Sequence, residues 1–221
     1  MKREEMALEM LGLSDPKDFA FYKALPLMMV DYEGFVKNRL TIRFTPKERA
    51  EKYDYARQIF CGDICLTTAL RIKGHDGQPR LCKITRHMMW IMGVDEEQLF
   101  KDAVENTKKL SDPVFFTYAD LGATFSDGFM KVCFDRRLVA GSAVIALPET
   151  RKAIVEKTED DSYIIPSSTE ELILIPASCR NKDKIQKLIH EVNSECVDDT
   201  DYLSDNLFLF KRDSREIVMV E

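Results

Sequence analysis

The feature that most constrains the fold is a pair of short apolar runs that each end in proline. The runs are Tyr163-Ile164-Ile165-Pro166 and Leu172-Ile173-Leu174-Ile175-Pro176, and a polar stretch separates them. Apolar runs of this length and composition are typical of strands. Proline lacks the backbone N–H that a continuing ladder needs, so each strand is expected to stop there. The sequence therefore predicts two short strands joined by a polar turn.

Elsewhere the apolar pattern changes repeatedly between the period of a strand and that of a helix. Residues 64–72 alternate as a half-buried strand does, and residues 81–84 follow a turn at 74–77 as the returning strand. Helices are predicted over 45–60, 85–92, 95–110, 151–158 and 181–193, with Thr85 and Gly93 as the N-cap and the stop of the second. Further strands are predicted over 129–134, 207–210 and 216–220, and 139–147 fits either a strand or the start of a buried helix.

This order of elements predicts an α+β fold, with small groups of mainly antiparallel strands and helices packed on them. Residues 1–26 are predicted to form an N-terminal helix and a linker. Residues 27–221 are predicted to form a single α+β domain, and two subdomains of about 27–125 and 126–221 are the alternative.

Composition excludes several classes of protein. The chain of 221 residues is 45% apolar and 32% charged, which is ordinary for a globular protein, and its formal charge is −6. That charge rules out a generally basic surface and argues against nucleic acid as a partner. No apolar run approaches the roughly 20 residues of a membrane span. The first 13 residues lack the apolar core of a secretory signal, so we expect a cytoplasmic protein.

Metal and cofactor chemistry receive little support from the sequence. Cys61, Cys65, Cys82 and His87 have the spacing C-x3-C-x16-C-x4-H, which resembles a zinc finger only loosely. In the reducing cytosol, buried free thiols are the preferred interpretation of the six cysteines. Phosphate-binding and metalloprotease motifs are missing from the sequence. We therefore predict no metal and no cofactor.

Two apolar clusters are predicted to lie in the core. Ile185, Leu188, Ile189 and Val192 are spaced as one face of a helix and are expected to dock that helix on the sheet. The run Met88–Met92, which contains Trp90, is expected to fill the core, with an adaptable partner surface as the alternative. A cluster of acidic residues is interpreted as a solvated turn rather than a cation site; it consists of Asp198, Asp199, Asp201 and Asp205.

The polar loop between the two strands that end in proline has the most specific sequence in the chain. Pro166, Ser167 and Ser168 begin it and Glu171 ends it. Serine hydroxyls commonly accept backbone N–H groups in such connections, which favours a structural turn. A polar loop held by two strands is also a suitable binding element, and this alternative stays open.

Residues of about 30–212 resemble a bacterial family known only as a domain of unknown function. The resemblance rests on five phrases: Asn106-Thr107, Gly141 to Pro148, Tyr163 to Ser168, Glu171 to Pro176, and Leu203-Ser204-Asp205. Members usually have a proline after the Asn-Thr pair, where this chain has Lys108, and a longer N-terminal region. The resemblance implies a cytosolic bacterial α+β protein and supplies no catalytic residues.

These observations favour a non-enzymatic protein-binding or regulatory module whose partner is an unidentified protein. The alternatives are a hydrolase that uses a Ser or Cys nucleophile, such as Ser167, and a small acidic inhibitor that mimics nucleic acid. No catalytic residue is predicted. The candidate binding residues are Pro166, Ser167, Ser168, Glu171, Asn106 and Trp90.

Overall fold

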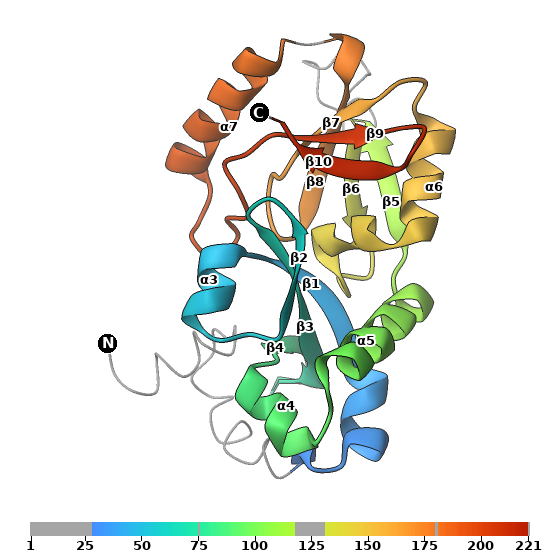
Figure 1. Ribbon diagram of the computed structural model, residues 1–221, viewed down its shortest axis with the longest axis vertical. Helices are drawn as coiled ribbons and strands as arrows, with labels where there is room; N and C mark the ends of the chain where they lie inside the picture. The colour runs from blue at the N-terminus through green and yellow to red at the C-terminus, as the bar shows by residue number, and fades with distance from the viewer. Residues whose placement is uncertain (1–27, 75, 118–130, 180, 221) are drawn as a thin grey trace. The chain divides into compact units, whose positions relative to one another are not determined.

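The computed structural model describes residues 28–74, 76–117, 131–179 and 181–220 (Figure 1). Two mainly antiparallel sheets with helices confirm the predicted α+β class. The predicted helix and linker of residues 1–26 lie outside the described residues. So does the alternative subdomain boundary near residue 125.

The chain divides into two compact units, each built from separate stretches. Among the described residues, unit 1 contains 28–43, 48–58 and 67–109, apart from residue 75. Unit 2 contains 44–47, 59–66, 110–117, 131–179 and 181–220.

A four-stranded sheet is formed by β1 (Leu40–Pro46), β2 (Arg57–Cys61), β3 (Ile64–Lys73) and β4 (Pro79–Lys83). Its order is β1-β3-β2, and β4 also pairs with β3 in antiparallel register. The predicted strand pair 64–72 and 81–84 is therefore confirmed. Residues 44–46, 59–61 and 64–66 of these strands belong to unit 2.

The helix predicted over 45–60 is wrong for most of its length. Only α3 (Lys47–Lys52) is helical, because Thr45 and Pro46 complete β1 and are buried there. The chain then turns at Asp54, which has a positive φ of 49°. The residues after it include Ile59 and Phe60, whose shapes suit a sheet, and they form β2.

The two predicted helices that follow are confirmed as α4 (Arg86–Met92) and α5 (Glu96–Leu110). The Thr85 hydroxyl accepts the Met88 N–H at 3.2 Å, so it is the N-cap of α4. Gly93 ends the helix with φ +64°, a left-handed conformation that glycine adopts without strain. Both ends of α4 are therefore fixed. Ahead of the sheet, unit 1 also contains a π-helical turn η2 (Tyr32–Val36) and a 3₁₀ turn η3 (Lys37–Arg39).

Unit 2 contains a six-stranded antiparallel sheet of order β10-β9-β7-β8-β6-β5. Its strands are β5 (Pro113–Thr117), β6 (Lys131–Asp135), β7 (Ser162–Ile165), β8 (Glu171–Pro176), β9 (Phe208–Lys211) and β10 (Glu216–Met219). The β7–β8 and β9–β10 hairpins confirm the predicted strand pairs. β5 was not predicted.

Helical elements cover both faces of this sheet (Figure 1). The 3₁₀ helix η4 (Gly141–Ala146) and α6 (Pro148–Lys157) lie on the face of Leu172 and Phe115, where the Lys157 ammonium sits over the Phe115 ring. The helix α7 (Lys182–Cys196) lies on the opposite face, against Ile165 and Ile175. A short 3₁₀ turn, η5 (Ala177–Cys179), follows β8.

For residues 139–147 the sequence allowed either a strand or the start of a buried helix. The structure has a tight turn followed by the 3₁₀ helix η4. The buried Asp135 carboxylate at the end of β6 organises that turn. One of its oxygens accepts the Asp112 and Arg137 N–H groups at 2.8 and 3.1 Å, and the other accepts those of Val139 and Ala140, both at 2.9 Å. Four N–H groups on one carboxylate satisfy the backbone of the turn, so the chain leaves the sheet there.

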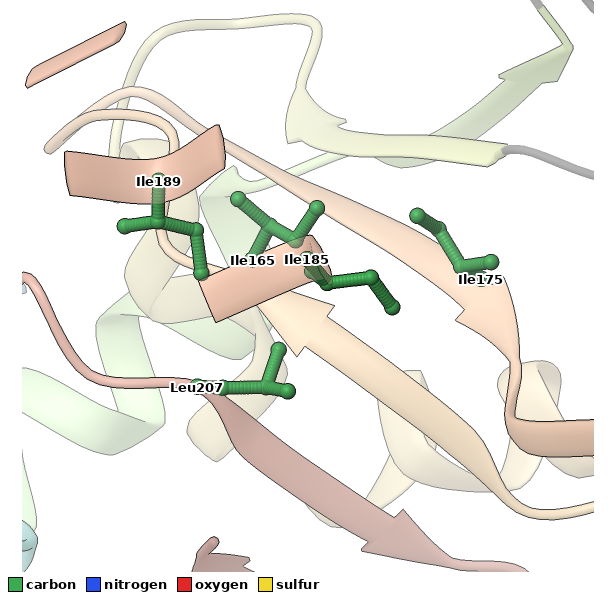
Figure 2. Close-up of a cluster of buried hydrophobic side chains, with 5 residues drawn as sticks. All are labelled: Ile165, Ile175, Ile185, Ile189 and Leu207. Atoms are coloured by element: carbon green, nitrogen blue, oxygen red, sulfur yellow. The ribbon is translucent and has the colours of Figure 1, made fainter. Parts of the chain in front are cut away.

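The docking face of α7 is narrower than its sequence pattern predicted. Ile185 and Ile189 are buried in a cluster with Ile165, Ile175 and Leu207 (Figure 2). Leu188 and Val192 are 51% and 43% exposed, so the prediction that they dock on the sheet is wrong. At 100° per residue these two lie on one margin of the apolar stripe, beyond the width that the strands cover.

Candidate functional site

One face of α4 carries the most exposed aromatic side chain among the residues that the structure describes. Trp90 is 78% exposed, and its ring stacks on His87 with centroids 5.9 Å apart and planes 20° from parallel. Arg86 lies one turn before Trp90 on the same exposed face. We call Arg86, His87 and Trp90 the α4 face.

The prediction that Met88–Met92 fills the core is correct for Met88 and Met92 and wrong for Trp90. The two methionines are buried, and they lie on the side of α4 opposite Arg86 and Trp90. A helix of seven residues packed on one side buries only one stripe. The indole therefore faces outward, as the alternative of a partner surface requires.

A second segment of unit 1 lies directly beside the α4 face. The Arg86 N–H donates to the Asp54 carbonyl at 2.9 Å, and Tyr55 and Thr85 form an antiparallel bridge. The Arg86 guanidinium and the Asp54 carboxylate also approach within 3.8 Å. The two stretches are thus paired at the N-terminal end of α4, where Tyr55 and Thr85 are buried and Asp54 lies beside Arg86.

The loop Pro166–Glu171 is held by a network of internal hydrogen bonds. The Ser168 hydroxyl accepts the Glu170 and Glu171 N–H groups at 3.1 and 3.2 Å, and the Ser167 hydroxyl donates to the Glu171 carboxylate at 3.3 Å. The buried Thr169 binds two other segments, since its N–H donates to Asp201 and its carbonyl accepts from Ser142. These contacts support the structural interpretation of the loop.

Asn106 and its neighbour Thr107 connect α5 to the residues before β1. The Asn106 amide donates to the Lys37 carbonyl, and the Thr107 hydroxyl accepts the Ile42 N–H at 3.1 Å. Nearby, the Tyr32 hydroxyl donates to the Asp102 carboxylate at 2.8 Å. Burial, and then this bond to Asp102, raises the pKa of Tyr32. The Asn-Thr pair therefore connects α5 to the residues before β1, and the binding role of Asn106 stays a prediction.

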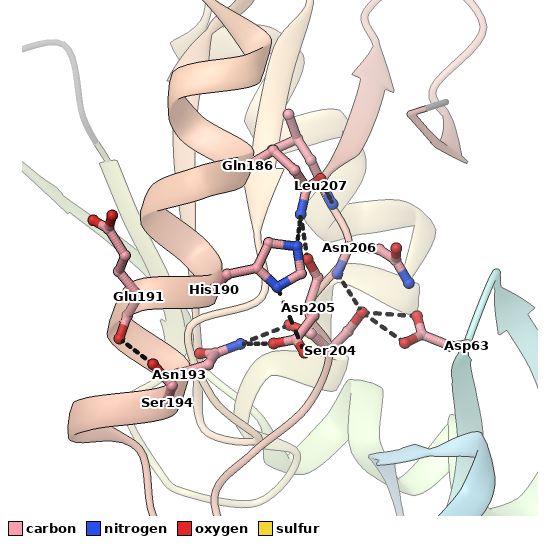
Figure 3. A network of polar contacts seen from close by, with 10 residues as sticks. All are labelled: Asp63, Gln186, His190, Glu191, Asn193, Ser194, Ser204, Asp205, Asn206 and Leu207. Carbon is pink, nitrogen blue, oxygen red and sulfur yellow. Dashed lines mark hydrogen bonds and ion pairs between the residues drawn. The ribbon is translucent and has the colours of Figure 1, made fainter.

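The phrase Leu203-Ser204-Asp205 is also explained by internal contacts (Figure 3). The buried Ser204 hydroxyl donates to the Asp63 carboxylate at 2.7 Å. Asp205 accepts the Asn193 amide at 2.8 Å and lies 3.7 Å from the ring of His190. Together these contacts hold the chain before β9 against α7 and against the β2–β3 turn.

The hollow beside this network is shallow and does not resemble a hydrolase site. It has a volume of about 470 Å³ and is lined mainly by α7 and Tyr202. Ser204 donates to Asp63, and Ser194 donates to the Glu191 carbonyl at 2.9 Å, so both hydroxyls have partners other than His190. The hydrolase alternative stays a prediction that these contacts do not support.

Most of the cysteine side chains that the structure describes are buried or half-buried. Cys65, Cys82 and Cys133 are buried free thiols, Cys61 is half-buried and Cys196 is exposed. Burial raises the pKa of both Cys82 and Cys133 to about 12. Within the described ranges, no three His, Cys, Asp or Glu side chains gather as metal ligands.

Sequence reasoning singled out Trp90 but missed the residues around it. Arg86, one turn before Trp90, and Asp54, which approaches Arg86, were not among the candidates. A usable signal was present in Lys52-Tyr53-Asp54-Tyr55-Ala56-Arg57, where basic and aromatic residues are interleaved in an otherwise acidic chain.

Comparison with known proteins gives one match. Residues 28–212 match the model of a protein family described as "Family of unknown function (DUF5688)". No curated protein and no solved structure matches the chain. In the part of the chain that the structure describes, no helix has the length and apolar character needed to cross a membrane.

Proposed function

Because the chain belongs to the DUF5688 family of unknown function, we propose its function from its own surface: it is a non-enzymatic protein-binding module that anchors its partner on Trp90. The observation that carries this proposal is the 78% exposure of the Trp90 side chain. Tryptophan is strongly enriched among the residues that dominate protein–protein binding energy.

The free energy gained by covering the Trp90 side chain supports an anchoring role. A buried aromatic side chain removes about 150–250 Å² from water, and apolar burial contributes about 25 cal/mol per Å². Covering the exposed part of Trp90 is therefore worth about 4 kcal/mol before the costs of association. Since α4 is capped at both ends and Trp90 stacks on His87, less conformational entropy is lost on binding.

The cellular context is part of the proposal. Free thiols at Cys65, Cys82 and Cys133 support a reducing compartment, which we take to be the bacterial cytoplasm. The partner there is a protein, because the formal charge of −6 opposes nucleic acid.

The test is affinity capture with the full chain as bait, carried out with wild type, Trp90→Ala and Leu138→Ala. Leu138 is a matched control because it is another exposed large apolar side chain, and it belongs to unit 2. The proposal expects a protein retained in near-stoichiometric amount by wild type and Leu138→Ala and lost by Trp90→Ala. A partner retained equally by all three baits would refute the role of Trp90.

A further inference from the structure

Unit 2 contains a pocket of about 550 Å³ between the C-terminal end of α6 and the six-stranded sheet. A volume of this size suits a small organic molecule. Residues 157–160 form one wall, and the sheet contributes Lys131, Ser162, Leu174 and Pro176. The pocket shares no residue with the α4 face, so it is a separate candidate site.

The sheet residues of the pocket point to the face that α6 covers. Ile165 and Ile175 pack in the cluster beneath α7. Side chains alternate along a strand, so Ser162 and Leu174, at odd offsets from these isoleucines, point to the opposite face. Lys131 is the cross-strand partner of Leu174 and shares its face.

The Ser162 hydroxyl is a buried polar group that the fold leaves unbonded. The residue is 1% exposed, and its Oγ has no hydrogen-bond partner among the described residues. Buried hydroxyls are normally hydrogen-bonded, because an unbonded one has lost its contacts with water without replacement. A ligand in the pocket can supply the missing partner.

Two ammonium groups line the same pocket. Lys131 is half-buried, and neither it nor Lys157 has a carboxylate partner in the part of the chain that the structure describes. The Lys157 ammonium sits 5.7 Å from the centre of the Phe115 ring, a contact that leaves its charge intact. An anionic group would therefore meet two cations and a hydroxyl donor.

Two carboxylates limit the kind of anion that fits. Glu159 and Asp160 also line the pocket, and both are exposed to solvent. One Asp160 oxygen accepts the Asp161 N–H at 2.8 Å. These exposed charges oppose a long polyanion, whereas a single anionic group can lie against the lysines.

Contacts inside unit 2 fix the walls of the pocket. The Arg212 guanidinium donates to the Thr158 and Val155 carbonyls at 3.0 and 3.4 Å, which holds the end of α6. The Ala177 N–H donates to the Asp161 carbonyl at 2.8 Å, which ties η5 to the residue before β7. A pocket whose walls are already ordered loses less conformational entropy when a ligand binds.

We propose that this pocket binds a small organic anion, in which one carboxylate or phosphate group is joined to an apolar body. The anionic group lies against the ammonium groups of Lys131 and Lys157 and accepts a hydrogen bond from the Ser162 hydroxyl. The apolar body packs on Leu174 and Pro176.

The test is titration of the full chain by ligand-observed NMR with four probes that share one aromatic ring: benzoate, phenyl phosphate, benzamide and benzylamine. We expect at least one of the two anions to bind with a Kd of about 0.1–1 mM, which is usual for so small a probe. The neutral benzamide and the cationic benzylamine should bind at least about 10-fold more weakly. The tighter of the two anions identifies the head group.

Charge-removing variants test the lysines. Lys131→Gln should weaken binding of the tighter anion about 10-fold, and Lys157→Gln about 3–10-fold. Lys152→Gln is the matched control, because Lys152 is an exposed lysine of α6 that does not line the pocket. It should leave binding unchanged.

Ser162→Ala distinguishes a ligand contact from a structural role. It should weaken binding about 3–10-fold, while the melting temperature of the free protein stays unchanged or rises, because the hydroxyl has no partner to lose. Ser142→Ala is the contrast: its buried hydroxyl donates to the Thr169 carbonyl at 2.8 Å, so its loss should lower the melting temperature and leave binding intact.

Three results would overturn the proposal. They are the lack of saturable binding of either anion up to about 10 mM, anion binding that Lys131→Gln leaves intact, and tighter binding of benzylamine than of both anions. None of them bears on the role proposed for Trp90.

Discussion

Two neighbouring residues of α7 should respond very differently to truncation. Ile189 is 3% exposed and packs in the cluster of Figure 2, whereas Leu188 is 51% exposed. Ile189→Ala removes three buried carbon groups, each worth about 0.8 kcal/mol in transfer free energy. The cavity that remains adds to this, so we expect a loss of about 3 kcal/mol in the free energy of unfolding.

Leu188→Ala removes the same number of carbon atoms from a half-solvated position on a helix. Alanine is also a slightly better helix former than leucine, which offsets part of the lost contact. We therefore expect a loss below about 1 kcal/mol.

Urea unfolding followed by far-UV circular dichroism measures the difference. At a denaturant dependence of about 2 kcal/mol per M, Ile189→Ala should lower the midpoint by about 1.5 M and Leu188→Ala by less than about 0.5 M. Equal shifts, or a larger shift for Leu188→Ala, would refute the packing described for α7.

Four further predictions concern polar groups and thiols. Ser168→Ala should cost about 0.5–2 kcal/mol in thermal or urea unfolding, because the Glu170 and Glu171 N–H groups lose their acceptor, and Ser167→Ala should cost less. Asp135→Asn should lower the free energy of unfolding by about 3 kcal/mol or more, because the new amide N–H₂ group faces two backbone N–H donors that the carboxylate had accepted. Asp112→Asn is the control: it weakens only an exposed ion pair and should cost less than about 1 kcal/mol. The folded-state pKa of about 12 at Cys82 and Cys133 exceeds the ordinary thiol value of about 8.5, so the unfolded chain loses these protons first. Their contribution to stability is complete below about pH 8.5 and is lost as the pH rises toward 12, which melting temperatures over this range measure. Alkylation mapped by mass spectrometry should modify the exposed Cys196 well before either buried thiol.

Local signals in the sequence predicted much of the fold. The prolines that end β7 and β8, the alternation in β3, and the caps Thr85 and Gly93 each act within a few residues of the chain. Such signals give the type of an element because the backbone geometry at that point depends on neighbouring residues.

Errors arose where distant contacts determine the structure. Residues 57–61 form a strand because they pair with β3, and residues 141–146 follow a turn that the Asp135 carboxylate organises from the preceding strand. The exposure of Leu188 depends on how far the strands extend beneath α7. None of these contacts is encoded in the local pattern of the segment concerned.

The candidate site was predicted only in part. Trp90 was named as a candidate, but its helical run indicated burial, and only the packing of Met88 and Met92 decides which side faces outward. Asp54, which approaches the neighbouring Arg86, comes from a stretch about 30 positions earlier in the chain, which the Tyr55–Thr85 bridge joins to the start of α4. Conversely, Asn106 and the serines at 167 and 168 make internal hydrogen bonds, so their specific phrases reflect the construction of the fold.

The central claim is that Trp90 is exposed in the free protein and covered by the partner. Trp90 is the only tryptophan in the chain, so its fluorescence reports on this position alone. The most direct measurement is acrylamide quenching of that fluorescence, with and without a saturating amount of the captured partner, prepared without tryptophan. The account predicts efficient quenching of the free protein and a blue-shifted, protected emission in the complex. Weak quenching of the free protein, or quenching that the bound partner leaves unchanged, would contradict it.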